Sequence, residues 1–279
     1  MSNPDFGGAR VLILESRRAR ELASLVTTYG GVPVVAPSMR EVPLDSNVEA
    51  LAFADALERG DFDLVVLLTG VGTRALLDTV DGVRGSRETF VRALGRTKVV
   101  ARGPKPLAVL RELGIAPWAI APEPNTWREV LGVLDERGDE QPIRGARVAV
   151  QEYGAPSPDL IAGLQARGAQ VTRVPVYRWA LPEDLEPLRE GIRALADGRV
   201  DAALVTSATQ IVHLLRIADD MGVGVATRDG LRAVMVASIG PTTSEELHRQ
   251  GVRVDLEPSH PKMGFLAREA AEAYAGVRR

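Results

Sequence analysis

The stretch "GARVLILESRR" at residues 8–18 decides the fold, because its opening recurs in "GARVAVQEYG" at residues 145–154. The two "GARV" motifs lie 137 residues apart. The same offset relates several later pairs: Gly31 and Gly168, Thr69 and Thr206, Gly103-Pro104 and Gly240-Pro241, Gly114 and Gly251, and Pro124 and Pro261. One unbroken register over most of each half predicts that the chain is an internal duplication with weak identity but shared architecture.

Both halves show the same order of predicted elements. Each opens with a short β-branched strand and continues with a helix near 17–29 or 157–167. The later pairs are extended "VPVVAP" and "QVTRVPVY", helices near 45–59 and 183–197, strands "DLVVLL" and "DAALVT", strands "KVVA" and "VMVASI", and strands "WAIAP" and "RVDLEP". This alternation predicts an α/β fold with parallel sheets, whose ligands bind at the carboxyl ends of the strands. The polar loop 135–142 is predicted to join the halves.

Composition excludes several classes of function. The 279 residues carry a formal net charge of −3, so the chain has no overall attraction for nucleic acid or anionic membranes. It has no cysteine, and the spacing of its three histidines matches no metal motif, so we expect no metal site. No apolar run approaches membrane-spanning length, and the N-terminus lacks a signal-peptide core. We therefore expect a soluble, cytoplasmic protein.

The turn "TGVGTRALLD" at 69–78 has a glycine pattern that also occurs in dinucleotide-binding turns. That fingerprint follows the first strand of its unit, with an acidic residue about 20 positions later. Here the turn follows a later strand, the region 81–90 is predicted to be loop, and the partner turn "TSATQI" contains no glycine. The alternative is a turn whose backbone N–H groups approach a ligand, with Arg74 in the first helical turn.

The Gly-Pro turns in "ARGPKPLAVL" and "SIGPTTSEEL" each separate a strand from a helix. In the second turn, Thr243 and Glu246 fit the S/T-x-x-E capping box, which is a sufficient structural explanation. The functional interpretation is that free N–H groups and hydroxyls bind a carboxylate or phosphate, favoured by the helix dipole. Arg102 and Lys105 would serve the matching turn.

Other candidate residues have an ordinary structural explanation beside a functional one. The arginines at 17, 18 and 20 fit an anion site or a solvated helix face, and "ESRR" lacks the acidic pair of a receiver domain. Tyr177, in "VPVYRW", either packs or donates a proton. His213 fits a structural role on its helix.

With these motifs in order, the sequence resembles the uroporphyrinogen-III synthase family from about residue 9 to 275. The resemblance rests on six segments: "VPVVAPSMREVP", "TGVGTRALL", "GARVAVQEYG", "GAQVTRVPVYRW", "DAALVTSATQIVHLL" and "VASIGPTTSEELHRQG". It implies two parallel-sheet α/β lobes joined by a two-stranded β ladder, with a cleft between them. Lobe 1 would comprise residues 1–37 and 178–279, lobe 2 residues 40–174, and the linkers would lie near 36–42 and 172–179.

The resemblance also implies a reaction: hydroxymethylbilane is cyclised to uroporphyrinogen III, with loss of water and inversion of ring D. No cofactor or metal is implied. The substrate carries carboxylates that many donors can bind, and catalysis would come from orientation and charge stabilisation. The implied protein is a monomer of tetrapyrrole biosynthesis that receives its substrate from hydroxymethylbilane synthase and binds neither nucleic acid nor membrane.

The resemblance assigns roles to particular residues. Tyr177 matches the family tyrosine that assists departure of the hydroxyl group, and is the candidate catalytic residue. The candidate substrate-binding residues are Arg17, Thr69, Gly70, Gly72, Arg102, Gly103, Tyr153, Gly154, Thr206, Ser207, Gly240, Thr242 and Thr243. Two positions depart from the commoner family pattern: a glycine-rich turn at 69–72, and Ser16-Arg17-Arg18 where many members have Thr-Arg-Pro.

Two rival functions remain open. One is a non-catalytic member of the same fold that binds a tetrapyrrole or another anion as a regulator. The other is a two-lobed nucleotide-binding enzyme, which rests on "TGVGTRA" alone.

Overall fold

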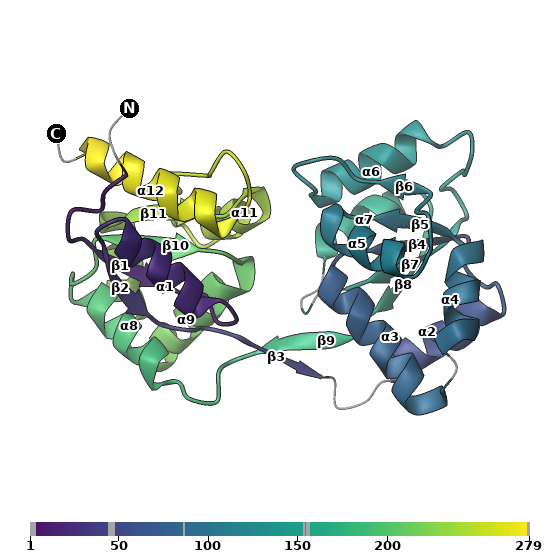
Figure 1. Ribbon diagram of the computed structural model, residues 1–279, viewed down its shortest axis with the longest axis horizontal. Helices are drawn as coiled ribbons and strands as arrows, with labels where there is room; N and C mark the ends of the chain where they lie inside the picture. Colours follow the sequence, from purple (N-terminus) through teal and green to yellow (C-terminus); the bar gives the residue numbers. More distant parts are fainter. Residues whose placement is uncertain (1–3, 44–47, 86, 153, 155–156, 278–279) are drawn as a thin grey trace. The chain divides into compact units, whose positions relative to one another are not determined.

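The computed structural model describes residues 4–43, 48–85, 87–152, 154 and 157–277. The chain forms two compact units (Figure 1). Unit 1 comprises Met1–Arg40 and Ala180–Arg279, and unit 2 comprises Glu41–Trp179. The first strand and helix of the chain therefore belong to the same unit as its last hundred residues.

The centre of unit 1 is a four-stranded parallel sheet in the order β11-β10-β1-β2. Its strands are β1 (Arg10–Ile13), β2 (Val32–Val35), β10 (Ala202–Val205) and β11 (Met235–Ser238). All four residues of "AALV" in β10 are buried, as expected for a strand covered on both faces. The element order thus brings β1 of the first half between β2 and β10.

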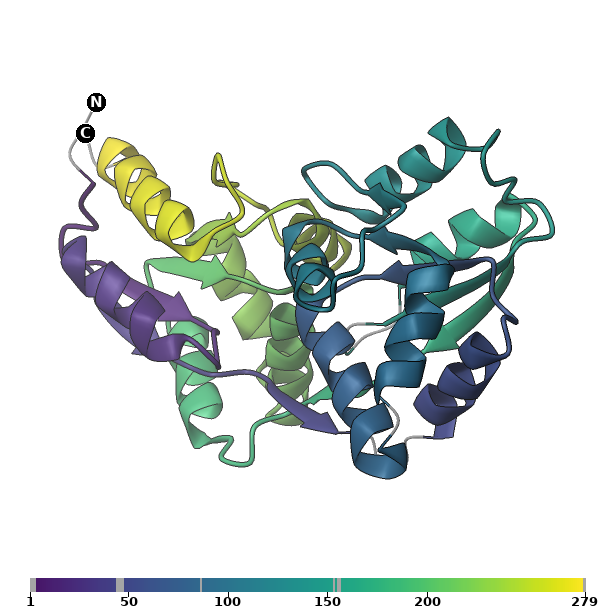
Figure 2. The ribbon, with the colours of Figure 1, turned by 45° about the vertical axis from the view of Figure 1, so that its right-hand side comes forward.

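Helices cover both faces of this sheet. They are α1 (Ala19–Thr28), α8 (Glu186–Ala196), α9 (Ala208–Asp220), α10 (Gly224–Ala233), α11 (Pro241–Arg249) and α12 (Met263–Val277). Helices α1 and α12 lie on one face of the sheet and α8 and α9 on the other (Figure 2). Side chains alternate along β1: Val11 and Ile13 pack in the core under α1 and α12, whereas Leu12 packs in the core under α8 and α9.

Unit 2 contains a five-stranded parallel sheet in the order β6-β5-β4-β7-β8. Its strands are β4 (Leu64–Leu67), β5 (Lys98–Ala101), β6 (Ala119–Ile120), β7 (Arg147–Gln151) and β8 (Gln170–Val174). Its helices are α2 (Val48–Glu58), α3 (Gly70–Arg84), α4 (Arg87–Arg96), α5 (Pro104–Glu112), α6 (Trp127–Glu136) and α7 (Pro158–Ala166). Two hydrophobic cores, one on each face of the sheet, hold these helices.

A separate two-stranded sheet pairs β3 (Arg40–Pro43) with β9 (Tyr177–Ala180), where the chain passes from one unit to the other. The predicted fold class, two parallel-sheet α/β lobes with a two-stranded ladder, is confirmed. No helix in the described ranges is long and apolar enough to span a bilayer.

The duplication is present, but its register is not unbroken. Gly8 and Gly145 correspond at an offset of 137, and their N–H groups donate to the carbonyls of Gly30 and Gly168 respectively. Gly168 therefore matches Gly30, at an offset of 138, and not Gly31. The offset of 138 also relates strands β4 and β10. Leu64 of β4 pairs with Val148 of β7, and Ala202 of β10 pairs with Val11 of β1. Because Val11 matches Val148, Leu64 matches Ala202, 138 residues later.

The helix that follows this strand shows the same shift. Thr69 is the N-cap residue of α3 and Ser207 is the N-cap residue of α9, so these two correspond and Thr206 matches Leu68. By Gly103 and Gly240, the N-cap residues of α5 and α11, the offset is again 137. The second half thus carries one extra residue before its second strand and one fewer after its third helix.

Several local predictions were wrong. Residues 81–90 are mostly helical, because α3 runs to Arg84 and α4 begins at Arg87, with Gly85 in the left-handed conformation between them. The predicted strand "RVDLEP" is a single bridge from Leu256 to Ala237. The polar stretch 135–142, predicted to join the sequence halves, is not among these errors, and it lies within unit 2.

Candidate functional site

The predicted site residues of unit 1 follow adjacent strands of its sheet. Arg17 follows β1, Thr206 and Ser207 follow β10, and the turn 240–243 follows β11. Because β11, β10 and β1 are neighbours and parallel, these loops meet at one edge, the carboxyl edge of unit 1. The structure therefore brings together, within unit 1, residues from both ends of the chain.

A closed hydrogen-bond network lies at the centre of this edge. The hydroxyl of Thr206 donates to Glu15 Oε2 at 2.5 Å and accepts from Gln210 Nε2 at 2.8 Å. Gln210 is buried, and its Oε1 accepts from the backbone N–H of Thr206 at 2.8 Å. Glu15 Oε1 also accepts from the backbone N–H of Arg18 at 3.2 Å. Sequence reasoning missed Glu15 and Gln210, although Glu15 stands directly beyond the apolar run of a predicted strand.

The Gly-Pro turn of unit 1 differs from its predicted capping. Helix α11 begins at Pro241 with Gly240 as its N-cap residue, so Thr243 is the third helical residue and makes no side-chain cap. Its backbone N–H donates to the Gly240 carbonyl, and Thr243 is buried. The predicted capping box is therefore wrong, because the helix starts one turn earlier than the threonine pattern suggested.

Donors remain available beside this turn. Thr242 is partly exposed, and within the described part of the chain its hydroxyl has no hydrogen-bond partner. The same holds for the hydroxyl of Ser207, which does not cap its helix. The hydroxyl of Ser244, in the first turn of α11, is buried without a partner among the described residues. Hydroxyls and helix N-termini together suit an anion.

The carboxyl edge of unit 2 is built in the same way. Thr69, Gly70 and Gly72 follow β4, Arg102 and Gly103 follow β5, and Gly154 follows β7. Tyr153 lies outside the described residues. The Thr69 hydroxyl accepts from the N–H of Gly72 at 3.0 Å, which caps α3. This edge therefore holds a capped helix N-terminus between two glycine turns.

Each unit has one buried glutamine amide at its carboxyl edge, but the glutamine comes from a different element in each unit. In unit 2 the side chain of Gln151, at the end of β7, covers Gly72, where an added Cβ would lie 2.0 Å from its Nε2. In unit 1 the residue matching Gly72 is Gln210, whose side chain is itself buried, and Leu14 stands where unit 2 has Gln151. Each amide oxygen accepts from the backbone at the end of the central strand. Any side chain at position 72 would therefore displace the amide group of Gln151.

The same glycine-to-alanine substitution is expected to affect stability differently at the two Gly-Pro turns. Gly103 has φ +87°, and an added Cβ would lie 2.5 Å from Asn125 Oδ1, so Gly103→Ala is expected to destabilise the chain by about 1–2 kcal/mol. Gly240 has an extended φ of 162°, with Pro261 Cβ at 3.7 Å, so Gly240→Ala is expected to change stability by less than about 0.5 kcal/mol. Chemical denaturation of both variants checks this; equal losses would contradict it.

Tyr177 lies beside Gly154 in unit 2. Its ring is 5 % exposed and packs edge-to-face on Trp179, with centroids 5.3 Å apart. Gly154 has φ +79°, and an added Cβ would lie 2.6 Å from Tyr177 Cε2. The packing interpretation of Tyr177 is thus correct, and its position next to β7 is compatible with the chemical one.

Glu152, the residue before Tyr153, is held by an ion pair. Its side chain is 5 % exposed, and Arg173 of β8 binds both carboxylate oxygens, at 2.7 and 3.0 Å. Hydrogen bonding to Glu152 raises the pKa of Arg173.

His213 of unit 1 is buried, and its Nδ1 lies 2.7 Å from the Ser38 carbonyl oxygen. Burial lowers the pKa of His213, which fits a structural role.

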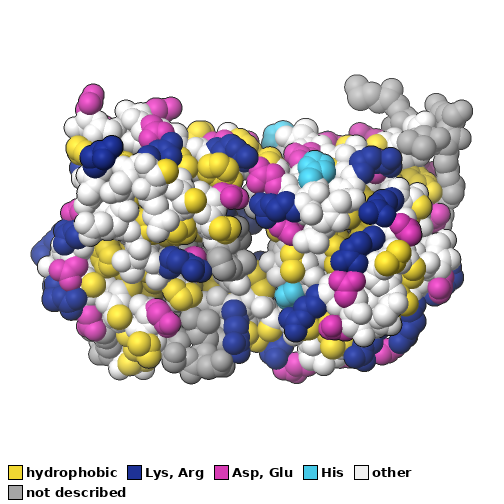
Figure 3. Space-filling model, turned by 180° about the vertical axis from the view of Figure 1, so that it is seen from behind, with side chains coloured by type: hydrophobic (Ala, Val, Ile, Leu, Met, Phe, Trp, Pro, Cys, Tyr) yellow, Lys and Arg dark blue, Asp and Glu magenta, His cyan; other side chains and the backbone are white. Residues whose placement is uncertain are grey.

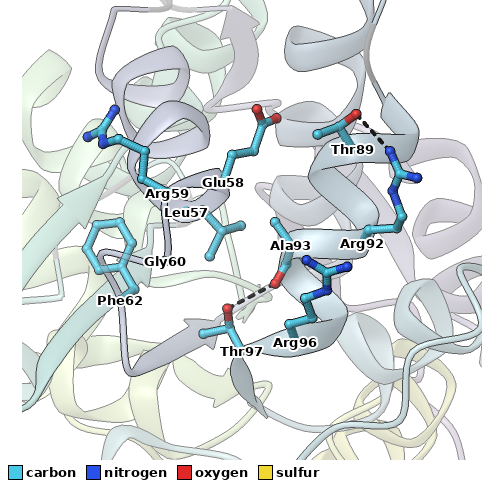
Figure 4. A pocket seen from close by; sticks show the side chains of 10 residues that line it. All are labelled: Leu57, Glu58, Arg59, Gly60, Phe62, Thr89, Arg92, Ala93, Arg96 and Thr97. Atoms are coloured by element: carbon cyan, nitrogen blue, oxygen red, sulfur yellow. Dashed lines mark hydrogen bonds between the residues drawn. The ribbon is translucent and has the colours of Figure 1, made fainter.

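One pocket in the described part of unit 2 lies away from the carboxyl edge of its sheet. A pocket of about 570 Å³ opens between α2 and α4 at the amino ends of β4 and β5, lined partly by Arg59, Arg92 and Arg96 (Figure 4). Arg59 pairs with Asp61, and Arg92 donates to Thr89, so two of these guanidinium groups already have partners. Figure 3 shows basic and acidic side chains interspersed on the face that it displays. Among the described residues no three His, Asp or Glu side chains are grouped as metal ligands.

Comparisons with known proteins agree with this architecture. A family model described as uroporphyrinogen-III synthase HemD matches residues 20–268. A protein of Methanothermobacter thermautotrophicus named "Putative uroporphyrinogen-III synthase" is 30% identical over 237 residues, covering 84% of this chain and 87% of its own. The Bacillus subtilis protein YjjA, named "Uncharacterized protein", is 31% identical over 269 residues, 96% of each chain.

Solved structures give the same result. A crystal structure of a mutant uroporphyrinogen III synthase from Thermus thermophilus matches with a TM-score of 0.74 and 26% identity, covering 97% of this chain and 100% of its own. A second crystal form, of the wild-type protein, matches with a TM-score of 0.59 and 27% identity, covering 98% and 100%. Given the family match and the shared two-unit fold, the chain belongs to the uroporphyrinogen-III synthase family.

Proposed function

We propose that this chain is an active uroporphyrinogen-III synthase, which cyclises hydroxymethylbilane to uroporphyrinogen III with inversion of ring D and loss of water. The observation that carries the proposal is the family match over residues 20–268. The duplicated carboxyl edges support it, because each offers helix N-termini and hydroxyls to an anionic substrate.

The substrate's carboxylates call for several separated donors. Most of the proposed donors stand at helix N-termini, where N–H groups and the helix dipole favour negative charge. They are Ser207, Gly240 and Thr242 in unit 1, and Thr69, Gly70, Gly72 and Gly103 in unit 2. Arg17 stands on a loop at the carboxyl edge of unit 1, and Arg102 and Gly154 stand on loops at the carboxyl edge of unit 2. Holding the linear tetrapyrrole at many points would fix which carbon attacks, and this orientation is the main source of rate.

Tyr177 is the proposed proton donor to the departing hydroxyl group. Its phenol carries a dissociable proton and stands beside the end of β7. Its apolar surroundings in the core of unit 2 would strengthen a hydrogen bond to the leaving oxygen.

The proposal extends to the setting of the reaction. The chain would act as a cytoplasmic monomer without metal or cofactor, in haem, sirohaem or cobalamin biosynthesis. It would receive hydroxymethylbilane from hydroxymethylbilane synthase, because a substrate that cyclises spontaneously favours rapid transfer.

Isomer analysis tests the proposal. The chain is supplied with hydroxymethylbilane, and the uroporphyrinogens are oxidised and separated. We expect isomer III. Isomer I alone, together with tight binding of a tetrapyrrole, would instead indicate a regulatory member of the family.

A further inference from the structure

We propose that Glu15 accepts a hydrogen bond from a pyrrole N–H of the substrate and stabilises the cation that forms when the hydroxyl group leaves. The proposal rests on the proposed function. It begins with the location of Glu15, which directly follows the apolar run of β1 at the carboxyl edge of unit 1 and is partly exposed.

The network around Glu15 presents acceptors and no donors. The hydroxyl hydrogen of Thr206 points to Glu15, and the amide hydrogens of Gln210 point to Thr206 and, at 3.5 Å, to Glu15. A carboxylate has about four lone-pair sites, and a hydroxyl oxygen accepts two hydrogen bonds. Acceptor capacity on Glu15 and Thr206 therefore remains. In this arrangement the Thr206 hydroxyl donates to Glu15 and offers no hydrogen to a substrate carboxylate, so we propose an acceptor role for it in place of the predicted donor role.

The duplication shows that the charge of Glu15 is unusual. Glu15 matches Glu152 of unit 2, which Arg173 neutralises. The residue in unit 1 that matches Arg173 is Val35, because β1 pairs Ile13 with Val35 as β7 pairs Val150 with Arg173. Among the described residues no lysine, arginine or histidine side chain forms an ion pair with Glu15.

An unneutralised carboxylate at an edge that binds a polyanion would repel its ligand, unless it faces a donor or a positive charge. A tetrapyrrole supplies both, first as pyrrole N–H groups and then as the cation. In that step the pyrrole nitrogen pair shifts into the ring and the C–O bond breaks. The oxygen leaves with the bonding electrons and one proton as water, and the N–H of the resulting cation donates to Glu15. The attacked ring regains its aromatic state when it accepts the new bond's electron pair. The ring whose carbon attacks becomes aromatic again by losing one proton, which replaces the proton taken up by the departing water.

Two substitutions test the proposal from different directions. Glu15→Gln keeps the shape and removes the charge, and it is expected to lower kcat about 100-fold and to raise KM less than about tenfold. Val35→Arg keeps Glu15 but places an arginine at the exposed position that matches Arg173, the residue that neutralises Glu152 in unit 2. This variant is expected to lower kcat at least about tenfold. Glu21→Gln, on the exposed surface of α1, is the control and is expected to leave kcat within about twofold.

Binding of uroporphyrinogen III is measured beside turnover, since it does not require catalysis. Glu15→Gln and Val35→Arg are each expected to weaken it about tenfold, because a charge-assisted hydrogen bond is lost. If the wild-type chain forms only isomer I, the proposed function fails and this binding comparison alone decides the role of Glu15. Variants that keep more than a third of the wild-type kcat and bind the product as tightly as the wild type would overturn the proposal, as would a wild-type chain that binds no tetrapyrrole.

Discussion

Replacing Gly70 with alanine is expected to destabilise unit 2 by about 2–4 kcal/mol. Gly70 is the first residue of α3, and an added Cβ would lie 2.7 Å from the backbone oxygen and 3.0 Å from the carbonyl carbon of Lys105 in α5. A backbone group cannot move aside as a flexible side chain does, so the two helices must separate and the core between them loosens.

Tryptophan fluorescence during urea unfolding measures this effect selectively, because all three tryptophans, Trp118, Trp127 and Trp179, lie in unit 2. Gly82→Ala is the matched control in the same helix. Nothing lies within 4 Å of its added Cβ, so it is expected to leave stability unchanged or raise it by up to about 1 kcal/mol. A Gly70→Ala chain as stable as the wild type would show that α3 and α5 do not pack as described.

Changing Tyr177 to phenylalanine is expected to lower kcat about 100-fold, which is typical of losing a general acid. The ring stays in the core against Trp179, so the thermal midpoint should change by less than about 2 °C. Steady-state kinetics and a melting curve on the same sample separate the two effects. Tyr29→Phe, at the C-cap of α1 in unit 1, is the control for loss of a phenol elsewhere.

A second variant separates the hydroxyl from its position. Gly154→Ala keeps Tyr177 but places a Cβ 2.5 Å from Trp179 Nε1 and 2.6 Å from Tyr177 Cε2, so the ring must shift. A comparable fall in kcat would support a role that depends on where the phenol stands. Full activity in both variants would remove Tyr177 from the mechanism.

The order of the elements could be predicted from the sequence because it depends on periodicity. Repeated apolar runs such as 64–67 and 202–205 indicate buried parallel strands, and "GARV" marks where each half begins. The prediction of one constant offset of 137 was wrong, because the offset changes to 138 in the middle of each half. Single-residue differences in turns leave no mark on hydrophobic patterns, and only strand pairing and the left-handed glycines show that Gly30 matches Gly168.

The candidate site was harder to predict, because its chemistry depends on which group a hydroxyl faces. Thr206 is a plausible carboxylate donor in sequence, yet its hydrogen is committed to Glu15, 191 residues away. The capping box was assigned to Thr243, whereas the structure forms one at Thr126 and Glu129, at the start of α6. Both differences arise from the exact start of a helix or the partner of one side chain, which propensity alone does not determine.

The isomer ratio formed from hydroxymethylbilane, followed as the concentration of the wild-type chain is raised, tests the central claim most directly. Without protein, spontaneous ring closure gives isomer I. If the chain is a synthase, the fraction of isomer III rises with protein concentration until it accounts for nearly all product, and Tyr177→Phe needs more protein to reach the same fraction. A product that stays isomer I at every protein concentration would contradict the proposed function.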